Sequence, residues 1–192
     1  VVQDGSTNGG FPLMREDGQN ASDSVRNTRV GDNAGNSFTG TDATDNTLIG
    51  YDAGTAITTG DANVAVGSYA LDSVTTASSI TGVGYGALSA LTTGSNNTAV
   101  GRNAMALTTT GSQNTAVGIY ALDANTTGGQ NTAIGDGTLG ANTTANNNTA
   151  VGLEALKVNT TGDNNVAIGA NALDANTTAS NNTAVGYGAG SA

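Results

Sequence analysis

The chain has 192 residues, of which 36% are hydrophobic and 4% aromatic, and a formal net charge of −10. This composition excludes a globular core built from large side chains, and five cations in the whole chain disfavour nucleic-acid binding and attraction to an anionic membrane. The sequence contains no histidine and no cysteine, which removes His-based triads, cysteine nucleophiles, disulfides and imidazole or thiolate metal sites. No apolar run approaches the ~18 residues of a membrane span. We therefore expect no enzymatic activity, no cofactor, no metal and no membrane insertion.

Residues 1–26 follow no regular pattern and include Pro12, the one proline of the chain. We expect this segment to be a cap or docking segment outside the repeat. A looser copy of the repeat begins at Asn27 and is two residues longer than the later copies. Residues 27–192 are predicted to form one solenoid of about ten coils, the last of them incomplete. Because the sequence stops partway through a repeat, we expect it to be a piece of a longer protein.

From Asn46 to Asn181 the sequence repeats every 17 residues, eight times, without insertion or deletion. We number the positions 1 to 17 from the start of each unit, so that Asn97 is position 1 and Gln113 position 17 of one unit. A strict short period is typical of solenoids, in which each unit is one coil stacked on a near-copy of itself. The Thr, Asn and Gly content disfavours helix. We predict an all-β parallel β-solenoid (β-roll) with two short strands per coil and a rise of about 4.8 Å per coil.

Positions 2 to 4 of each unit are predicted to form the first strand, and position 5 is glycine in every copy. An invariant glycine indicates a corner with positive φ or a close backbone approach. Positions 2 and 4 share one face of a strand. We expect their β-branched side chains to point inward, and the small alanine at position 3 to face a partner chain. The frame residues of the central units are Val100, Val117, Ile134 and Val151 at position 4, with Gly101 and Gly118 at position 5.

The second half of each unit repeats a Thr-Thr pair at positions 13 and 14, which predicts the second strand because β-branched residues favour extended backbone. Asparagine recurs at position 1, and in-register asparagines are expected to hydrogen-bond side chain to side chain between coils. The central members of this column are Asn97, Asn114, Asn131 and Asn148. Position 12 is apolar or Thr in the early units and Asn from Asn125 onward, so we expect one edge of the rod to change from apolar to polar.

Positions 6 and 7 are the variable positions of the unit, and they hold all five tyrosines. Variation confined to one turn of a constant scaffold is typical of a recognition surface, and exposed Tyr can stack on sugars or contact protein. The alternatives are that this turn tolerates any residue, or that Tyr fills a groove between chains. The candidate recognition turn comprises Tyr51, Tyr69, Tyr85, Arg102, Tyr120, Glu154 and Tyr187.

Several features that suggest other chemistry are accounted for by the repeat. Residues 135–140 match G-x-G-x-x-G, but Gly135 is the position-5 corner and no helix follows to receive a pyrophosphate. Asp72, Asp123 and Asp174 recur three coils apart, about 14 Å along the rod, which is too far for a glycosidase pair. The double Thr column suggests ice binding, although only one of two adjacent Thr can face outward on a strand.

The segment Asn-Thr-Ala-Val-Gly-x-x-Ala-Met at Asn97, with Leu in place of Met in most units, resembles the head repeats of trimeric autotransporter adhesins and the shaft repeats of bacteriophage tail fibres. The resemblance covers about residues 27–192, and the 17-residue unit is longer than the adhesin unit. It implies a left-handed β-roll with three chains side by side, carried on a cell surface or a virion. Trimerisation would also supply burial that a coil with three or four large apolar residues lacks.

These observations predict an elongated, non-enzymatic extracellular fibre or adhesin that attaches to a host-surface glycan or protein. We expect a homotrimer, with a single-chain solenoid and an end-to-end polymer as alternatives. A purely structural filament or shaft is the second functional prediction, and an ice-binding solenoid is a minor third.

Overall fold

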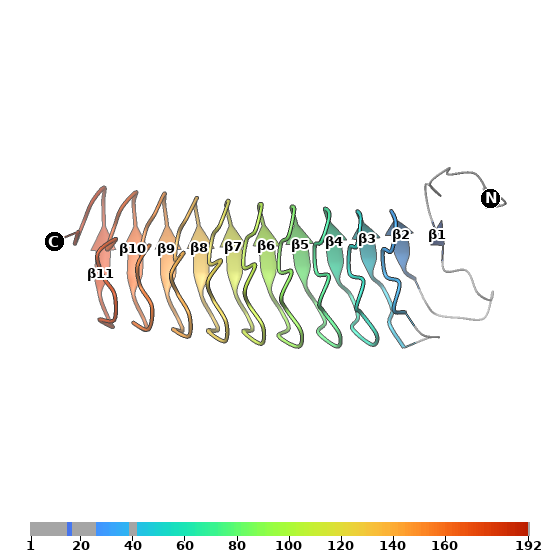
Figure 1. The fold of residues 1–192 in the computed structure, drawn as a ribbon. Helices are drawn as coiled ribbons and strands as arrows, with labels where there is room; N and C mark the ends of the chain where they lie inside the picture. The colour runs from blue at the N-terminus through green and yellow to red at the C-terminus, as the bar shows by residue number, and fades with distance from the viewer. Residues whose placement is uncertain (1–14, 17–25, 39–41, 192) are drawn as a thin grey trace.

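The computed structural model describes residues 15–16, 26–38 and 42–191, and these form a rod of stacked coils (Figure 1). Each coil contributes one three-residue strand to a single sheet, and the two-residue strand β1 precedes them. The strands are β1 Arg15–Glu16, β2 Thr28–Val30, β3 Thr47–Ile49, β4 Val64–Val66, β5 Thr81–Val83, β6 Thr98–Val100, β7 Thr115–Val117, β8 Thr132–Ile134, β9 Thr149–Val151, β10 Val166–Ile168 and β11 Thr183–Val185. None of the described residues belongs to a helix long and apolar enough to cross a membrane.

The sheet runs in chain order from β1 to β11, with β2 to β11 parallel and β1 antiparallel to β2. Equivalent positions of successive coils pair directly, as Ala99 does with Ala116 and Val100 with Val117. The predicted all-β parallel solenoid of 17-residue coils is therefore confirmed. Residues 1–14 and 17–25 lie outside the described residues, so the cap or docking role of residues 1–26 stays a prediction, to which β1 adds only its pairing with the edge of β2.

The prediction of two strands per coil is wrong, because positions 13 and 14 form a bend rather than a strand. This side of the rod is nevertheless held by its own ladder. The Thr109 N–H donates to the Thr126 carbonyl at 2.9 Å, and the Thr109 hydroxyl donates to the same oxygen at 3.1 Å. The repeated Thr at position 13 thus ties the bent backbone to the next coil through its hydroxyl, a hydrogen bond that Val or Ile could not make.

The predicted facing of the strand is also wrong. Position 3 points into the coil, where Ala99, Ala116 and Ala133 are fully buried. Position 4 points outward, so that Val100 and Val117 are each 37% exposed and Ile134 is 39% exposed. Alanine at position 3 is therefore an interior residue and cannot provide the face toward a partner chain.

The reason for this facing lies across the coil, at position 9. Leu71 and Leu88 fill the interior from the opposite wall, and even a Cβ added to Gly82 at position 3 would lie 3.0 Å from Leu71 Cδ2. The β3 coil reverses the two sizes: Leu48 stands at position 3, and the position-9 residue is Gly54, whose added Cβ would lie 2.8 Å from Leu48 Cδ2. A large side chain fits on only one wall of so thin a core.

Position 1 forms a buried column of asparagines that bond mainly to backbone and that is broken at one coil. The Asn131 side-chain oxygen accepts the Asn148 N–H at 3.0 Å, while its Nδ2 donates to the Ala145 carbonyl at 2.8 Å. Ile80 interrupts the column, because it accepts no hydrogen bond from the next coil. At position 12 the asparagines bond both to each other and to backbone, as from Asn142 Nδ2 to Asn125 Oδ1 at 3.0 Å and to the Ala145 carbonyl at 3.2 Å. Both columns are buried, so the change from apolar to polar at position 12 occurs inside the rod and not on its edge.

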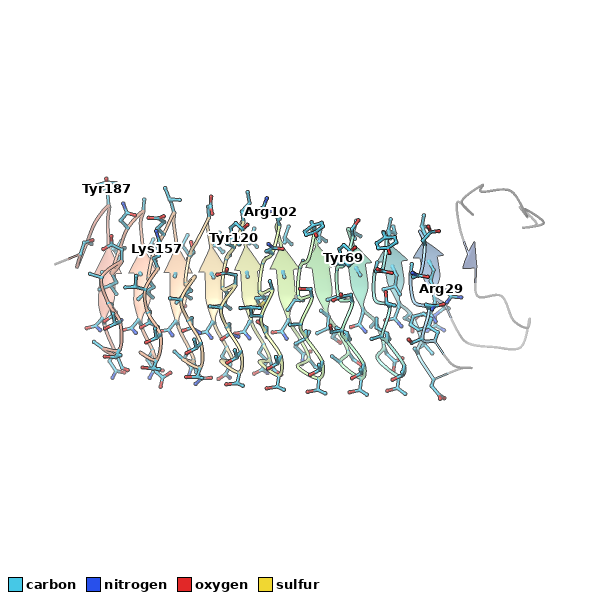
Figure 2. All side chains as sticks on the ribbon, viewed as in Figure 1. Arg29, Tyr69, Arg102, Tyr120, Lys157 and Tyr187 are labelled. Carbon is cyan, nitrogen blue, oxygen red and sulfur yellow. The ribbon has the colours of Figure 1, made fainter. Side chains whose placement is uncertain are left out.

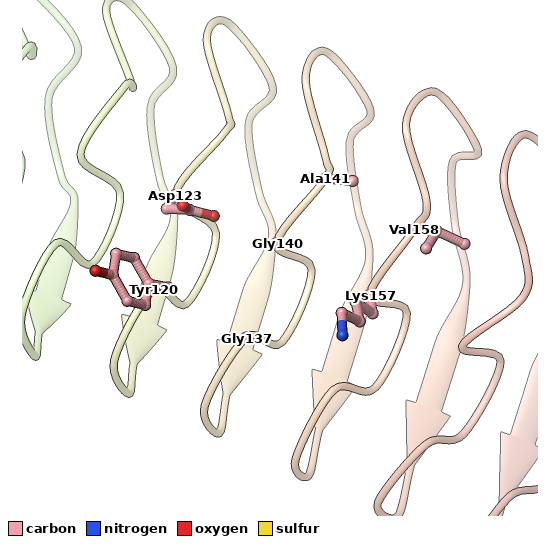
Figure 3. A pocket seen from close by; sticks show the side chains of 7 residues that line it. All are labelled: Tyr120, Asp123, Gly137, Gly140, Ala141, Lys157 and Val158. Carbon is pink, nitrogen blue, oxygen red and sulfur yellow. The ribbon is translucent and has the colours of Figure 1, made fainter.

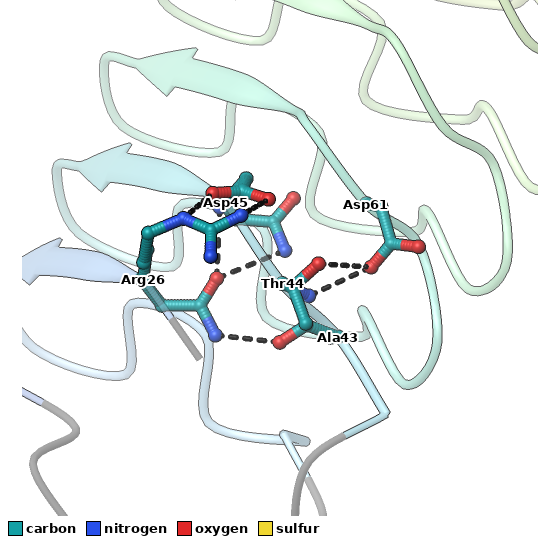
Figure 4. Close-up of polar contacts among 7 residues, drawn as sticks. Arg26, Ala43, Thr44, Asp45 and Asp61 are labelled. Carbon is teal, nitrogen blue, oxygen red and sulfur yellow. Dashed lines mark hydrogen bonds and ion pairs between the residues drawn. The ribbon is translucent and has the colours of Figure 1, made fainter. Parts of the chain in front are cut away.

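The N-terminal coil is tied to its neighbours by polar contacts, of which the Thr44–Asp61 contact recurs between Asn146 and Asp163 in a later coil (Figure 4). Arg26 and Asp45 form an exposed ion pair with Nε and Oδ1 2.5 Å apart. The Thr44 N–H and hydroxyl both donate to Asp61 Oδ1, at 2.7 and 3.1 Å. These contacts hold the longer connection of the first copy against the regular stack.

Candidate recognition surface

Positions 6 and 7 form a row of turns along one side of the rod, which we call the turn edge. The backbone of this edge is constant: the Tyr69 N–H donates to the Tyr51 carbonyl at 2.9 Å, and the Tyr120 N–H donates to the Arg102 carbonyl at 3.1 Å. Position 7 has a left-handed conformation, with φ of 60° at Tyr69 and 55° at Tyr120. Because this frame uses backbone groups only, the side chains at positions 6 and 7 can vary without changing the coil.

Three of the predicted residues form a row of rings over successive coils. The Tyr51 and Tyr69 ring centroids are 5.4 Å apart with an interplanar angle of 80°, and those of Tyr69 and Tyr85 are 5.6 Å apart at 78°. Edge-to-face pairs of this kind are favourable beyond their burial. Asp52 raises the pKa of the Tyr51 hydroxyl, with a smaller contribution from Tyr69. The row is therefore aromatic and bordered by negative charge.

The other predicted residues occupy the remainder of the turn edge in smaller groups (Figure 2). The Arg102 guanidinium lies over the Tyr120 ring, 5.0 Å from its centroid, and donates to the Tyr120 hydroxyl. Glu154 pairs with Lys157, with Oε1 and Nζ 2.7 Å apart. Tyr187 is 84% exposed in the last coil and joins neither group. The structure thus places all seven residues along one edge but in separate clusters.

A second exposed feature was missed by sequence reasoning. The outward position-4 side chains form an apolar stripe along the sheet, which comprises Ile49, Val66, Val83, Val100, Val117, Ile134, Val151, Ile168 and Val185. Thr or Val at position 2 lies beside it on the same face. The signal was in the sequence, since position 4 is always Val or Ile, but it was assigned to the core. An unbroken stripe of this length is typical of an interaction surface.

The turn edge and the apolar stripe are the two exposed features on which a binding partner could lie. Within the described residues no group of three or more acidic side chains is placed to hold a metal ion. Aromatic rings, one guanidinium and single carboxylates along a rigid edge are suited to stacking and hydrogen bonding with an extended partner. Comparisons with models of protein families, with curated protein sequences and with solved structures each returned no match.

Proposed function

We propose that this chain is part of an elongated, non-enzymatic surface fibre that attaches to a host-surface glycan or protein through its turn edge. The observation that carries the proposal is the contrast between a backbone frame repeated in every coil and a variable edge that gathers all the tyrosines. A rigid rod holds such an edge away from the surface that carries it, so the proposed location is outside a cell or on a virion.

The test of attachment compares variants on host cells or on isolated cell-surface material. Tyr69→Ala removes the central ring of the aromatic row, and Tyr120→Ala removes the ring under Arg102. Both should weaken attachment if the turn edge binds. Thr110→Ala and Thr127→Ala are the matched controls, because these side chains are exposed at position 14, away from the turn edge, whereas the Thr hydroxyls that donate to the next coil are those of position 13. Attachment that the Tyr variants leave unchanged would contradict the proposal.

We also propose that the fibre is a homotrimer whose chains meet through the apolar stripe. The stripe supports this because five of its residues are 37–40% exposed in the same column, and burying them against a partner removes apolar area from water. These five are Ile49, Val100, Val117, Ile134 and Ile168. Val117→Lys and Ile134→Lys should convert the trimer to monomers in a mass measurement in solution, while Thr127→Lys should not. A monomeric wild-type chain, or an open end-to-end polymer, would refute the trimer.

The second candidate function is a purely structural filament or shaft, which the apolar stripe favours because it continues through successive coils from Ile49 to Val185. In that case contacts lie only between subunits, and the Tyr variants leave attachment unchanged while the stripe variants disrupt assembly. Ice binding remains a third proposal, for which position 14 presents one exposed Thr column, since the position-13 hydroxyls donate to the next coil. Measured thermal hysteresis would support it.

A further inference from the structure

A hollow interrupts the surface of the rod where one coil carries glycine at two outward positions. Gly137 at position 7 and Gly140 at position 10 belong to the coil of β8, and they lie between Tyr120 and Asp123 of the preceding coil and Lys157 of the following one (Figure 3). The hollow has a volume of about 340 Å³, which is at the small end of the range for ligand sites. Both glycines belong to the G-x-G-x-x-G match at residues 135–140. Here their missing side chains leave a hollow in the surface of the rod, and they do not form a dinucleotide-binding loop.

The side chains around the hollow differ in chemistry and converge on it. Figure 3 shows Asp123 and Lys157 reaching toward the Gly140 coil from its two sides. Asp123 Oδ1 lies 3.6 Å from the point that a Cβ on Gly140 would occupy. Arg102 covers the Tyr120 ring from the preceding coil, whereas Gly137 in the following coil has no side chain with which to cover it. The hollow therefore has an aromatic wall, a carboxylate acceptor and an ammonium donor.

We propose that this hollow binds a single pyranose unit of a glycan, with the sugar lying against Tyr120 and its hydroxyls bonded to Asp123 and Lys157. A pyranose combines an apolar C–H face with hydroxyls that both donate and accept, which is the combination that these three side chains match. The charges argue against an anionic sugar, because Lys157 is already paired with Glu154 at 2.7 Å and Asp123 adds a further negative charge. The inference rests on the proposed attachment function and names the ligand class of one part of the turn edge.

Other coils carry a side chain at position 10, where the hollow has Gly140, so a substitution at Gly140 can test the site. Position 10 carries Asp123 and Lys157 in the two neighbouring coils, so Gly140→Gln fills the hollow without changing the frame. Ala106→Gln is the matched control, at position 10 of the β6 coil and outside the hollow. Tyr120→Leu removes the aromatic wall and keeps an apolar side chain.

The experiment follows backbone amide shifts of the ¹⁵N-labelled chain during titration with glucose, galactose, mannose and N-acetylglucosamine, and with glycine as a zwitterionic probe. At least one sugar should shift the Gly137 and Gly140 amides, and glycine should not. Gly140→Gln and Tyr120→Leu should bind that sugar about tenfold more weakly or worse, whereas Ala106→Gln should bind as the wild type does.

The inference is overturned if no sugar shifts the two glycine amides, if glycine shifts them as well as the sugars do, or if Gly140→Gln binds unchanged. Attachment to cells is scored separately. If Gly140→Gln attaches normally while Tyr69→Ala does not, the hollow is not the site and the proposed function stands. If the wild-type chain does not attach to any host surface, the proposed function itself fails.

Discussion

The position-5 glycine provides the sharpest test of how the coils stack, and the chain contains its own control. In Gly118→Ala the new Cβ would lie 2.3 Å from the Gly135 carbonyl oxygen and 2.6 Å from its carbon, both backbone atoms of the next coil. In Gly186→Ala the nearest atom to the new Cβ is the Ala189 Cβ at 3.9 Å. Both glycines have φ in the region that L-residues avoid, at 142° and 129°, so the two variants share the backbone strain and differ in the clash.

The strain common to both variants costs about 1–3 kcal/mol. The clash in Gly118→Ala adds to it, because the Gly135 backbone must move away and loosen the bonds from Gly135 N to the Val117 carbonyl at 2.8 Å and from Gly137 N to the Ile119 carbonyl at 3.0 Å. At about 0.5–1.5 kcal/mol for each weakened bond, with the strand contacts beside them, we expect Gly118→Ala to cost about 3–6 kcal/mol in total.

The assay is thermal unfolding followed by circular dichroism, with Gly137→Ala as a third variant. Gly137 lies in the middle of the rod with φ of 61°, and its added Cβ would meet only Glu154 Cγ at 3.8 Å. At about 2–4 °C per kcal/mol for a chain of this size, Gly118→Ala should lower Tm by roughly 6–24 °C, and the other two by less, because they carry the backbone strain without the clash. If Gly118→Ala loses no more stability than Gly186→Ala and Gly137→Ala, close backbone approach is not what position 5 requires.

Three further predictions concern single positions of the coil. Asn131→Ala leaves the buried Asn148 N–H without its acceptor, while the Ala145 carbonyl keeps the Asn142 Nδ2 donor at 3.2 Å, and the variant should cost about 1–3 kcal/mol in urea unfolding; exposed Gln130→Ala should be nearly neutral, and equal costs would refute the importance of the column. Ala62→Asn should stabilise the chain by about 0.5–1 kcal/mol, because Ala62 is exposed with φ of 56° and Asn tolerates this conformation better; an unchanged or lower Tm would contradict this. Burial raises the pKa of Asp123 above 3.8, so the folded state binds the proton more tightly than the unfolded state, and stability should rise as pH falls from neutral through the folded pKa. Asp123→Asn should therefore be more stable than the wild type near pH 7 and lose that advantage near pH 3, and an advantage that grows at low pH would show that the sign is wrong.

Much of the architecture could be read from the repeat, because stacking in register brings each position against its own copies. A glycine that recurs at position 5 must meet another position-5 backbone, as Gly101 and Gly118 do. An asparagine that recurs at position 1 must lie beside the next one, as Asn114 and Asn131 do. The variable positions 6 and 7 likewise fall on one edge whatever the path of the coil.

The hollow could not be read from sequence in this way. It arises because two glycines of one coil stand between Tyr120 and Asp123 of the coil before and Lys157 of the coil after. Tyr120 and Lys157 are far apart in the sequence, and only the stacking of three successive coils brings them to the two sides of Gly137 and Gly140. From the sequence, Gly137 and Gly140 can be recognised only as part of a G-x-G-x-x-G match, and not as the residues that line the bottom of a hollow.

By itself, the sequence determined the period, the parallel stacking and the columns of like residues, since these depend only on each unit resembling the next. Tertiary structure decided which side of the strand faces inward, because three residues establish only that positions 2 and 4 oppose position 3. The choice is made by the opposite wall, where Leu at position 9 leaves room for nothing larger than Ala at position 3 and turns Val100 and its equivalents toward solvent. The β3 coil shows the same constraint in the sequence, because it has Leu48 at position 3 and Gly54 at position 9. This exchange can be interpreted only once positions 3 and 9 are known to face each other across the core.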